Sequence, residues 1–335
     1  MDQSPYLSVI VTSRNDDPRG ELIKRMQSFI NALFAQCQKY KLNIELILVE
    51  WNPPEDRPRL SKILTSPQTN YGIIRIIEVP PKTHKYFKNS SKIPIFQMIA
   101  KNVGIRRSKG QFVLATNIDI LFSNELIEYL ASHKLQEKFV YRIDRYDVPD
   151  NIFSTTPIDS ILKYCDTHVV KINTREGTII THENRLNDLL VIIKNFIHKV
   201  IVKSRKPVRL HTNACGDFTL LGRREWFKLK GYPEYNLFAA KIDGLLCYAA
   251  YYSGLEEKVL NGKLKIYHVE HVARNDGIVA AISALKQQAG IDNLVINSKR
   301  YNDLISKMSS MKKPIILNKS DNWGLPNIAL EEYTV

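Results

Sequence analysis

Short apolar runs alternate with amphipathic stretches over the first 120 residues of the chain. Four runs rich in β-branched and other apolar residues predict buried strands: Leu7–Thr12, Glu45–Glu50, Gly72–Val79 and Gln111–Thr116. Two stretches between them, Glu21–Tyr40 and Phe96–Arg106, carry apolar residues at helical spacing. The order strand, helix, strand, strand, helix, strand predicts an α/β protein with a mostly parallel sheet and right-handed crossovers.

The pattern is less regular after residue 120. Helical spacing predicts three further helices and one basic amphipathic segment: Asn124–Leu135, Ile242–Ser253, Gly277–Ala289 and Glu183–Val202. Strand-like patterns occupy Phe139–Ile143, Arg209–Arg224 and Leu264–His271, the last two with loops. Residues from Lys312 onward are rich in turn formers.

Polar side chains follow three of the predicted parallel strands. They lie in Ser13–Asp17, Glu50–Pro54 and Asn117–Asp119. Ligands of open α/β sheets bind beyond the carboxyl ends of the strands. Acidic and amide groups there suit a ribose, a base or a metal ion, so the sequence predicts a nucleotide site at this edge.

Composition narrows the class of protein. The chain has 335 residues, 44% of them hydrophobic, which is enough for a substantial core. We expect no secretory signal and no membrane span, because no apolar run reaches spanning length. The formal net charge of +14 favours a polyanionic partner. Nucleic acid is not expected, since the chain carries no zinc finger, aromatic RNA signature or long basic tail.

Four widely spaced cysteines, Cys37, Cys165, Cys215 and Cys247, predict reduced and mostly buried thiols rather than a zinc site or a disulfide framework. We therefore expect a cytoplasmic protein. The basic stretch 194–209 is either a solvated helix face or a peripheral contact with an anionic membrane or a lipid-linked acceptor.

The segment Lys101–Asp119 resembles a helix, strand and metal motif of the GT-A glycosyltransferases, in particular the inverting family 2. The family has Asp-x-Asp where this chain has Asn117-Ile-Asp119. The opening Ser8–Asn15 resembles the family's first strand and nucleotide-binding loop, and Glu45–Asn52 its second strand with an acidic residue near the base.

A second block supports the resemblance. Gly216–Glu234 is similar to the family's acceptor-side segment, and Ala240–Asp243 stands where the family has its catalytic base. Tyr267–His271 resembles a late histidine motif that completes metal binding in several GT-A branches.

The resemblance implies a GT-A fold, mostly parallel and flanked by helices. We expect a nucleotide-sugar-binding half (residues 1–120) and an acceptor-binding, catalytic half (121–275) to share one sheet. A C-terminal extension (276–335) would pack on the site or cover it. The activity implied is transfer of a sugar from a nucleotide-diphosphate donor to a hydroxyl of a glycan or glycolipid, with inversion, as in polysaccharide biosynthesis.

The resemblance also assigns roles to residues. Asp119 would bind Mn²⁺ or Mg²⁺, a hard cation that prefers carboxylate oxygens. The late histidine would be His271 or His268, with His271 preferred; alternation along a strand places them on opposite faces. Asp243 would be the general base and Asp217 would bind acceptor hydroxyls. The predicted contacts to the nucleotide or its diphosphate are Thr12, Arg14, Asn15, Asp16, Glu50, Lys101, Asn102, Arg107 and Asn117.

Other interpretations stay open. Asp119 and Asp243 are each placed where an aspartate caps a helix, and Asp16 precedes a proline turn. Trp323 is either a sugar-stacking residue or a buried anchor. A nucleotidyltransferase is the competing enzyme class, although the loop after the first strand lacks glycine. A non-catalytic basic nucleic-acid- or sugar-binding module is the third alternative, because Asn117 departs from the metal motif.

Overall fold

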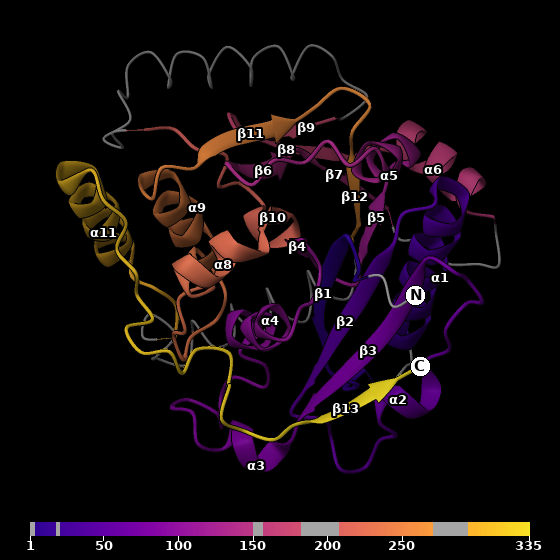
Figure 1. Cartoon of the computed structure of the whole chain (residues 1–335), viewed down its shortest axis with the longest axis horizontal. Helices are drawn as coiled ribbons and strands as arrows, with labels where there is room; N and C mark the ends of the chain where they lie inside the picture. The colour runs from indigo at the N-terminus through magenta and orange to yellow at the C-terminus, as the bar shows by residue number, and fades with distance from the viewer. Residues whose placement is uncertain (1–3, 18–20, 150–156, 182–207, 271–293) are drawn as a thin grey trace.

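The computed structural model describes residues 4–17, 21–149, 157–181, 208–270 and 294–335. Within these residues the chain forms an eight-stranded sheet and a five-stranded sheet, with helices packed against them (Figure 1). The predictions for Glu183–Val202 and Gly277–Ala289, and most of the basic stretch 194–209, fall outside the described residues.

The larger sheet has the strand order β11-β6-β10-β4-β1-β2-β3-β13. Its strands are β1 (Leu7–Ser13), β2 (Ile44–Trp51), β3 (Gly72–Val79), β4 (Phe112–Ala115), β6 (Phe139–Ile143), β10 (Thr219–Gly222), β11 (Glu256–Leu260) and β13 (Glu331–Thr334). Pairs β1–β2, β2–β3, β1–β4 and β6–β11 are parallel, and β10 and β13 run antiparallel to their neighbours. The predicted α/β class with a mostly parallel central sheet is confirmed.

Both faces of the central strands are buried, which is why their sequences are continuous apolar runs. Every residue of β1 and β2 is buried. Successive side chains alternate between two cores: Ile10 and Ile47 belong to one, Val9 and Leu46 to the other. Helices α4 (Gln97–Arg106), α8 (Arg223–Leu229) and α9 (Ile242–Tyr252) cover the first face, and α1 (Glu21–Tyr40) and α5 (Asn124–Ala131) the second (Figure 1).

Both predicted halves contribute strands to the larger sheet, the second through β6, β10 and β11, but the second half also forms most of another sheet. A second sheet has the order β5-β12-β7-β8-β9. Its strands are β5 (Ile120–Phe122), β7 (Arg145–Val148), β8 (Lys171–Thr174), β9 (Gly177–Ile180) and β12 (Ile266–Val269), and α6 (Ile158–Thr167) packs beside it. The predicted strand segment Leu264–His271 contains β12, but the other strands have only three or four residues, too few positions to show a period of two, so the sequence pattern did not identify them.

The described part of the C-terminal segment packs at two places, against helix α9 and on an edge strand of the larger sheet. Helix α11 (Ser298–Met311) contacts α9, and β13 pairs with the edge strand β3. Trp323 between them is 2% exposed and lies under the Arg106 guanidinium, 4.8 Å from the ring centroid. Trp323 is therefore a buried anchor, which decides between the two interpretations left open by the sequence.

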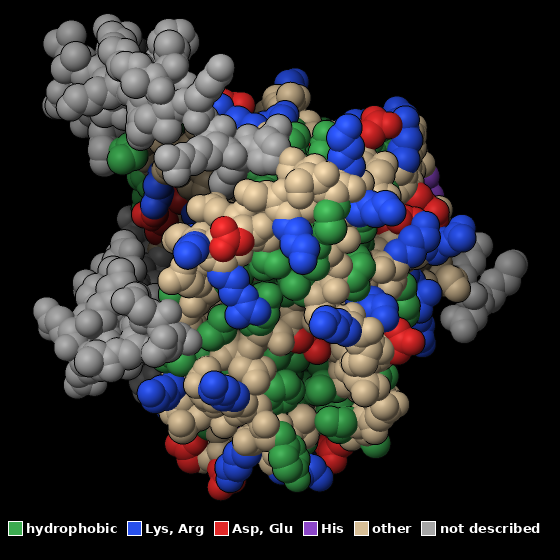
Figure 2. All heavy atoms as spheres, turned by 90° about the vertical axis from the view of Figure 1, so that its left-hand side faces the viewer, with side chains coloured by type: hydrophobic (Ala, Val, Ile, Leu, Met, Phe, Trp, Pro, Cys, Tyr) green, Lys and Arg blue, Asp and Glu red, His purple; other side chains and the backbone are tan. Residues whose placement is uncertain are grey.

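No helix among the described residues is both long and apolar enough to cross a bilayer. All four cysteines are buried and free, as expected. Lys and Arg side chains spread over the face that lies on the left in Figure 1, where α11 is, with Asp and Glu side chains in fewer places (Figure 2), in keeping with the net charge of +14.

A buried polar network centred on Glu45 of β2 lies near the amino ends of β1 and β2 in the larger sheet. Its carboxylate, 0% exposed, accepts from the Ser8 hydroxyl at 2.5 Å, the Lys109 backbone N–H at 2.5 Å and the Arg75 guanidinium at 2.5 Å. Arg75 also pairs with Glu332 of β13 at 2.6 Å. The network thus joins β1, β2, β3, β13 and the turn before β4.

Replacing Arg75 by Met should lower the free energy of unfolding by about 3–5 kcal/mol, because Glu45 would keep its buried charge without a cationic partner. Urea unfolding measures this loss. The control is Lys24→Met, which removes an exposed partner of Glu21 and should cost under about 1 kcal/mol. Equal losses for the two variants would contradict the assigned role of the network.

Candidate functional site

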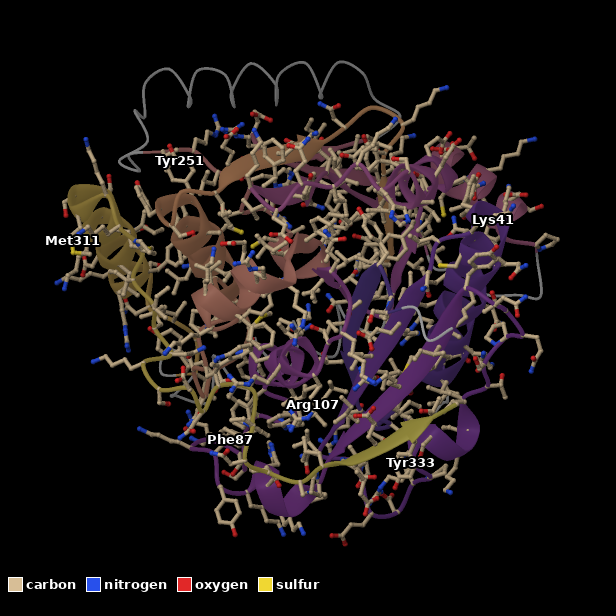
Figure 3. All side chains as sticks on the ribbon, in the orientation of Figure 1. Lys41, Phe87, Arg107, Tyr251, Met311 and Tyr333 are labelled. Carbon is tan, nitrogen blue, oxygen red and sulfur yellow. The ribbon has the colours of Figure 1, made fainter. Side chains whose placement is uncertain are left out.

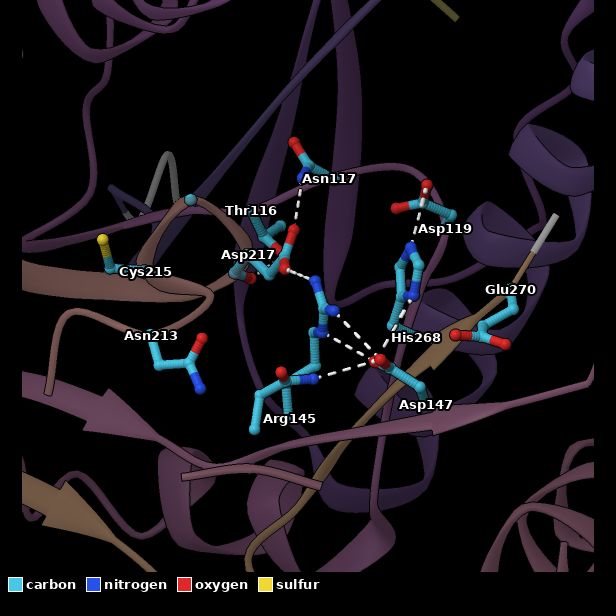
Figure 4. A network of polar contacts seen from close by, with 12 residues as sticks. Thr116, Asn117, Asp119, Arg145, Asp147, Asn213, Cys215, Asp217, His268 and Glu270 are labelled. Carbon is cyan, nitrogen blue, oxygen red and sulfur yellow. Dashed lines mark hydrogen bonds and ion pairs between the residues drawn. The ribbon is translucent and has the colours of Figure 1, made fainter. Parts of the chain in front are cut away.

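The candidate site begins where β4 ends and the chain crosses to β5. Asp119, the residue before β5, is 5% exposed. Strand β12 pairs antiparallel with β5, with His268 opposite Ile120. This register places His268 Nε2 3.7 Å from Asp119 Oδ2 (Figure 4). The two sheets therefore meet at Asp119, and a carboxylate and an imidazole lie side by side there.

His268 also contacts a second carboxylate. Its Nδ1 lies 3.5 Å from Asp147 Oδ1 on the neighbouring strand β7. Burial alone would lower the pKa of His268, but hydrogen bonds with Asp119 and Asp147 raise it to about 9. The imidazole is therefore a cation at neutral pH, held between two carboxylates.

Asp147 is 0% exposed and is surrounded by donors. Arg145 Nε lies 2.7 Å from its Oδ1, Lys171 Nζ lies 3.3 Å from its Oδ2, and the Asn173 amide donates to Oδ2 at 3.0 Å. Burial would raise the pKa of Asp147, but His268 and Arg145 hold it at about 2. Asp147 is therefore ionised and joins three cations into one network.

Arg145 extends the network to the segment that the sequence assigns to the acceptor. Its Nη1 donates to Asp217 Oδ2 at 2.5 Å, and Asp217 Oδ1 accepts from the Asn117 amide at 2.5 Å. Gln97, the first residue of α4, donates to Asn117 Oδ1 at 2.9 Å. Figure 4 shows the resulting chain of contacts from Asn117 through Asp217, Arg145, Asp147 and His268 to Asp119.

A buried ammonium group lies next to the segment that contains Asp217. Lys101 is 0% exposed, and its Nζ donates to the Gly216 carbonyl at 2.6 Å. Burial lowers its pKa to about 8, while the charges of Asp217, Asp243 and Asp119 oppose that shift. The Lys101 ammonium therefore lies beside the Gly216–Asp217 segment and binds the protein backbone.

Asp243 lies in the first turn of α9, and its Oδ1 accepts from the Gly244 N–H at 2.9 Å. Burial raises the pKa of its carboxyl, against hydrogen bonds from the Cys215 thiol and the Gly244 N–H. Asp243 thus combines a helix-capping contact with a raised proton affinity, which a general base can use.

The residues predicted for the nucleotide after the first strand hold the local turn. The Asn15 amide donates to the Pro58 carbonyl at 2.9 Å, and Arg14 lies 3.8 Å from the Asp16 carboxylate. Thr12 is 7% exposed. Burial raises the pKa of Asp16. These groups stay together at the carboxyl end of β1, as the sequence predicts.

Glu50 occupies the carboxyl end of β2 and is 1% exposed. One carboxylate oxygen accepts from the Leu60 N–H at 3.0 Å, at the start of α2 (Leu60–Ile63). Burial and the nearby Glu78 charge raise its pKa to about 7, against the Leu60 hydrogen bond and Arg59. The side chain is therefore partly protonated at neutral pH.

Two predicted nucleotide contacts have structural partners instead. The Asn102 amide donates to the Tyr232 carbonyl at 2.8 Å and to Glu234, and its oxygen accepts from the Tyr232 N–H. Arg107, just beyond the last residue of α4, donates to the carbonyls of Gly324 and Leu325 (Figure 3). Gln97, at the other end of α4, contacts Asn117. Arg107 lies about 15 Å along the helix axis from Gln97. The structure does not bring Arg107 to the carboxylates.

His271 lies outside the described residues. Of the two late histidines, the structure brings His268 to Asp119. Arg145, Asp147 and Lys171 were missed by the sequence reasoning. The alternation Arg145-Tyr-Asp147, with two charged side chains on one face of a strand, was the available signal.

Comparisons with known proteins give a likeness of fold only. No family model matches the chain, and no curated protein matches it in sequence. Among solved structures it is similar to GalNAc-T7 crystallised with UDP, GalNAc and Mn²⁺, with a TM-score of 0.44 and 11% identity. The match covers 91% of this chain and 48% of that one, so this chain spans about half the length of the solved protein. A likeness at this level concerns the path of the backbone, not the activity.

The protonation of Glu50 predicts a pH effect on stability. The folded protein holds this proton up to about pH 7, whereas the unfolded chain loses it near 4.5. Stability should therefore fall as pH rises from 4.5 to 7, by on the order of 3 kcal/mol. Glu50→Gln should lack this fall when urea unfolding is followed across that range. Glu55→Gln in the adjacent exposed loop is the control, and identical slopes for both variants would refute the assignment.

Proposed function

We propose that this chain is a GT-A-type glycosyltransferase that moves a sugar from a nucleotide-diphosphate donor to a hydroxyl acceptor with inversion. One observation carries the proposal. Predicted site residues from separate parts of the sequence come together: Asp217 accepts from the amide of Asn117, two residues before Asp119, and Lys101 donates to the carbonyl of Gly216, next to Asp217. A Cβ at Gly216 would lie 3.0 Å from Asp243 Oδ2. Inverting transfer needs this combination near one reacting centre.

The donor would lie beyond the carboxyl ends of β1, β2 and β4. Glu50 and the segment Thr12–Asp16 are suited to the base and ribose, since they offer carboxyl, amide and hydroxyl groups at that edge. Asn117 is placed to meet the donor beside Asp119. The Lys101 Nζ already donates to the Gly216 carbonyl, so Lys101 would stabilise the diphosphate through its charge and not through a direct contact.

The donor set fits a divalent cation that substrate phosphates complete. Among the described residues, no group of three or more His, Cys, Asp or Glu side chains is arranged to hold a metal ion. Asp119 and His268 provide a carboxylate and an imidazole side by side. Mg²⁺ commonly binds through one or two carboxylates with phosphates and waters, and an imidazole favours Mn²⁺. Such a cation would neutralise charge on the leaving diphosphate. His268 must release its proton before it can bind a metal.

Asp243 is the proposed general base. It would take the proton of the acceptor hydroxyl while that oxygen bonds to the anomeric carbon and the bond from this carbon to the phosphate oxygen breaks. The leaving group is the nucleoside diphosphate. Burial raises the pKa of the Asp243 carboxyl and so strengthens it as a proton acceptor. Asp217 would hold acceptor hydroxyls, although both of its oxygens already accept from Asn117 and Arg145.

A panel of nucleotide sugars, each with and without Mn²⁺, tests donor binding by thermal shift. We expect a rise in Tm only with donor and metal together, because ligands that bind the folded state stabilise it. Asp119→Ala should lose the metal-dependent part, while Asp56→Ala in an exposed loop should keep it. If no nucleotide diphosphate shifts Tm and DNA duplexes bind with a steep salt dependence, the nucleic-acid alternative is favoured.

Product analysis separates the two enzyme classes, since glycosyl transfer releases a nucleoside diphosphate and nucleotidyl transfer releases pyrophosphate. Asp243→Asn should bind donor with unchanged affinity and transfer at least about 100-fold more slowly, because the proton acceptor is lost. Asp303→Asn on exposed α11 is the matched control. Normal transfer by the Asp243 variant would mean that another residue is the base.

A further inference from the structure

A short basic turn after β3 protrudes from the body of the protein. It starts with α3 (Pro81–His84), and hydrogen bonds from the Lys85, Tyr86 and Phe87 N–H groups continue the turn. It lies at the lower end of the molecule in Figure 1. Tyr86 is 87% exposed, more than any other large hydrophobic residue that the structure describes. An aromatic ring this exposed projects outward and does not line a groove.

The inner face of the turn is fixed to the protein. His84 is 4% exposed; its Nδ1 accepts from the Trp51 indole at 2.9 Å, so its Nε2 carries the proton that faces the Ser90 carbonyl at 3.0 Å. The Phe87 ring packs 5.5 Å from Trp51 and 5.4 Å from Phe96 between centroids. Burial lowers the pKa of His84, so it stays neutral. The outward direction of Tyr86 is therefore set by the fold.

The outer face carries only positive charge. Lys82, Lys85, Lys88 and Lys92 are all exposed. No Asp or Glu occurs anywhere from residue 79 to residue 118. The loop that follows β2 lies next to the turn: the Asn52 amide in this loop donates to the carbonyl of Pro94, just after the turn, at 3.0 Å. That loop has Glu55 and Asp56 balanced by two arginines, so it does not offset the four lysines.

We propose that the basic turn, Pro81–Lys92, docks on an anionic phospholipid surface with the Tyr86 ring at headgroup depth. Tyrosine favours the interface between water and lipid because it joins an apolar ring to a polar hydroxyl. Lysines near an anionic leaflet each strengthen binding about fivefold. Nucleic acid fits less well: its binding proteins use grooves with several aromatic residues and often arginine forks, whereas this turn is a single protruding ring with lysines alone.

Sedimentation with vesicles measures the partition coefficient directly. The vesicles are phosphatidylcholine alone or with roughly one third phosphatidylserine, at about 0.1 M and about 0.5 M salt. Lys82→Gln with Lys85→Gln should lower binding to the anionic vesicles about twentyfold. The control pair, Lys134→Gln with Lys263→Gln, removes the same charge from exposed sites elsewhere and should bind nearly as the wild type does. If the control pair loses binding equally, net charge and not this turn is responsible, and the proposal fails.

Insertion of the ring has its own test. Trp51, Trp226 and Trp323 are each at most 2% exposed, so brominated lipids should quench the wild type little. Tyr86→Trp should show strong quenching by brominated anionic vesicles and none by brominated neutral ones. Unquenched emission while the protein is vesicle-bound would overturn the assignment. A second result would also overturn the proposal. In that result, neither the wild type nor the Lys82→Gln, Lys85→Gln variant binds vesicles, while a single-stranded oligonucleotide binds the wild type twentyfold more tightly than the variant.

Discussion

The buried charge of Asp147 is the constraint on which the candidate site depends. An ionised carboxylate that is 0% exposed is stable only with close donors, and here Arg145, Lys171 and His268 surround it. Arg145 in turn holds Asp217, and His268 lies against Asp119. The Asp147 carboxylate, on a short strand of the smaller sheet, thus fixes the partners of both Asp217 and Asp119.

The larger sheet also contains a buried carboxylate that is paired with a cation. At the amino edge, Glu45 and Arg75 form a closed structural network. The network around Asp147, on β7 of the smaller sheet, differs in that its cationic members Arg145, Lys171 and His268 are partly exposed. Part of the segment that resembles the family motif, Lys101–Asp119, has a packing role. A side chain at Gly104 would come within 2.6 Å of Ile10, and Asn102 joins α4 to Tyr232 by a hydrogen bond, so these two positions serve packing.

Prediction from the sequence succeeded where many residues carried one pattern. Glu21–Tyr40, Phe139–Ile143 and Gly72–Val79 were predicted with the bounds that the structure has, because continuous burial or a long amphipathic face leaves a strong periodic signal. It failed for β5, β7, β8 and β9 of the smaller sheet and did not identify α8, whereas β12 and β10 lie within the segments predicted as strands with loops, Leu264–His271 and Arg209–Arg224. Those elements are short, and their positions follow from tertiary pairing more than from local preference.

The sequence by itself determined the α/β class and the polar residues at the strand ends, since periodicity and the order of elements are properties of the chain itself. Asp119 as a metal ligand is what the family resemblance of Lys101–Asp119 implies. The tertiary structure decided which side chains contact one another. The β5–β12 register brought His268 to Asp119, and α4 carried Arg107 away from the site. The physical reason is that an ion pair between distant residues depends on which strands are neighbours and in what register, and a one-residue shift turns every side chain to the opposite face.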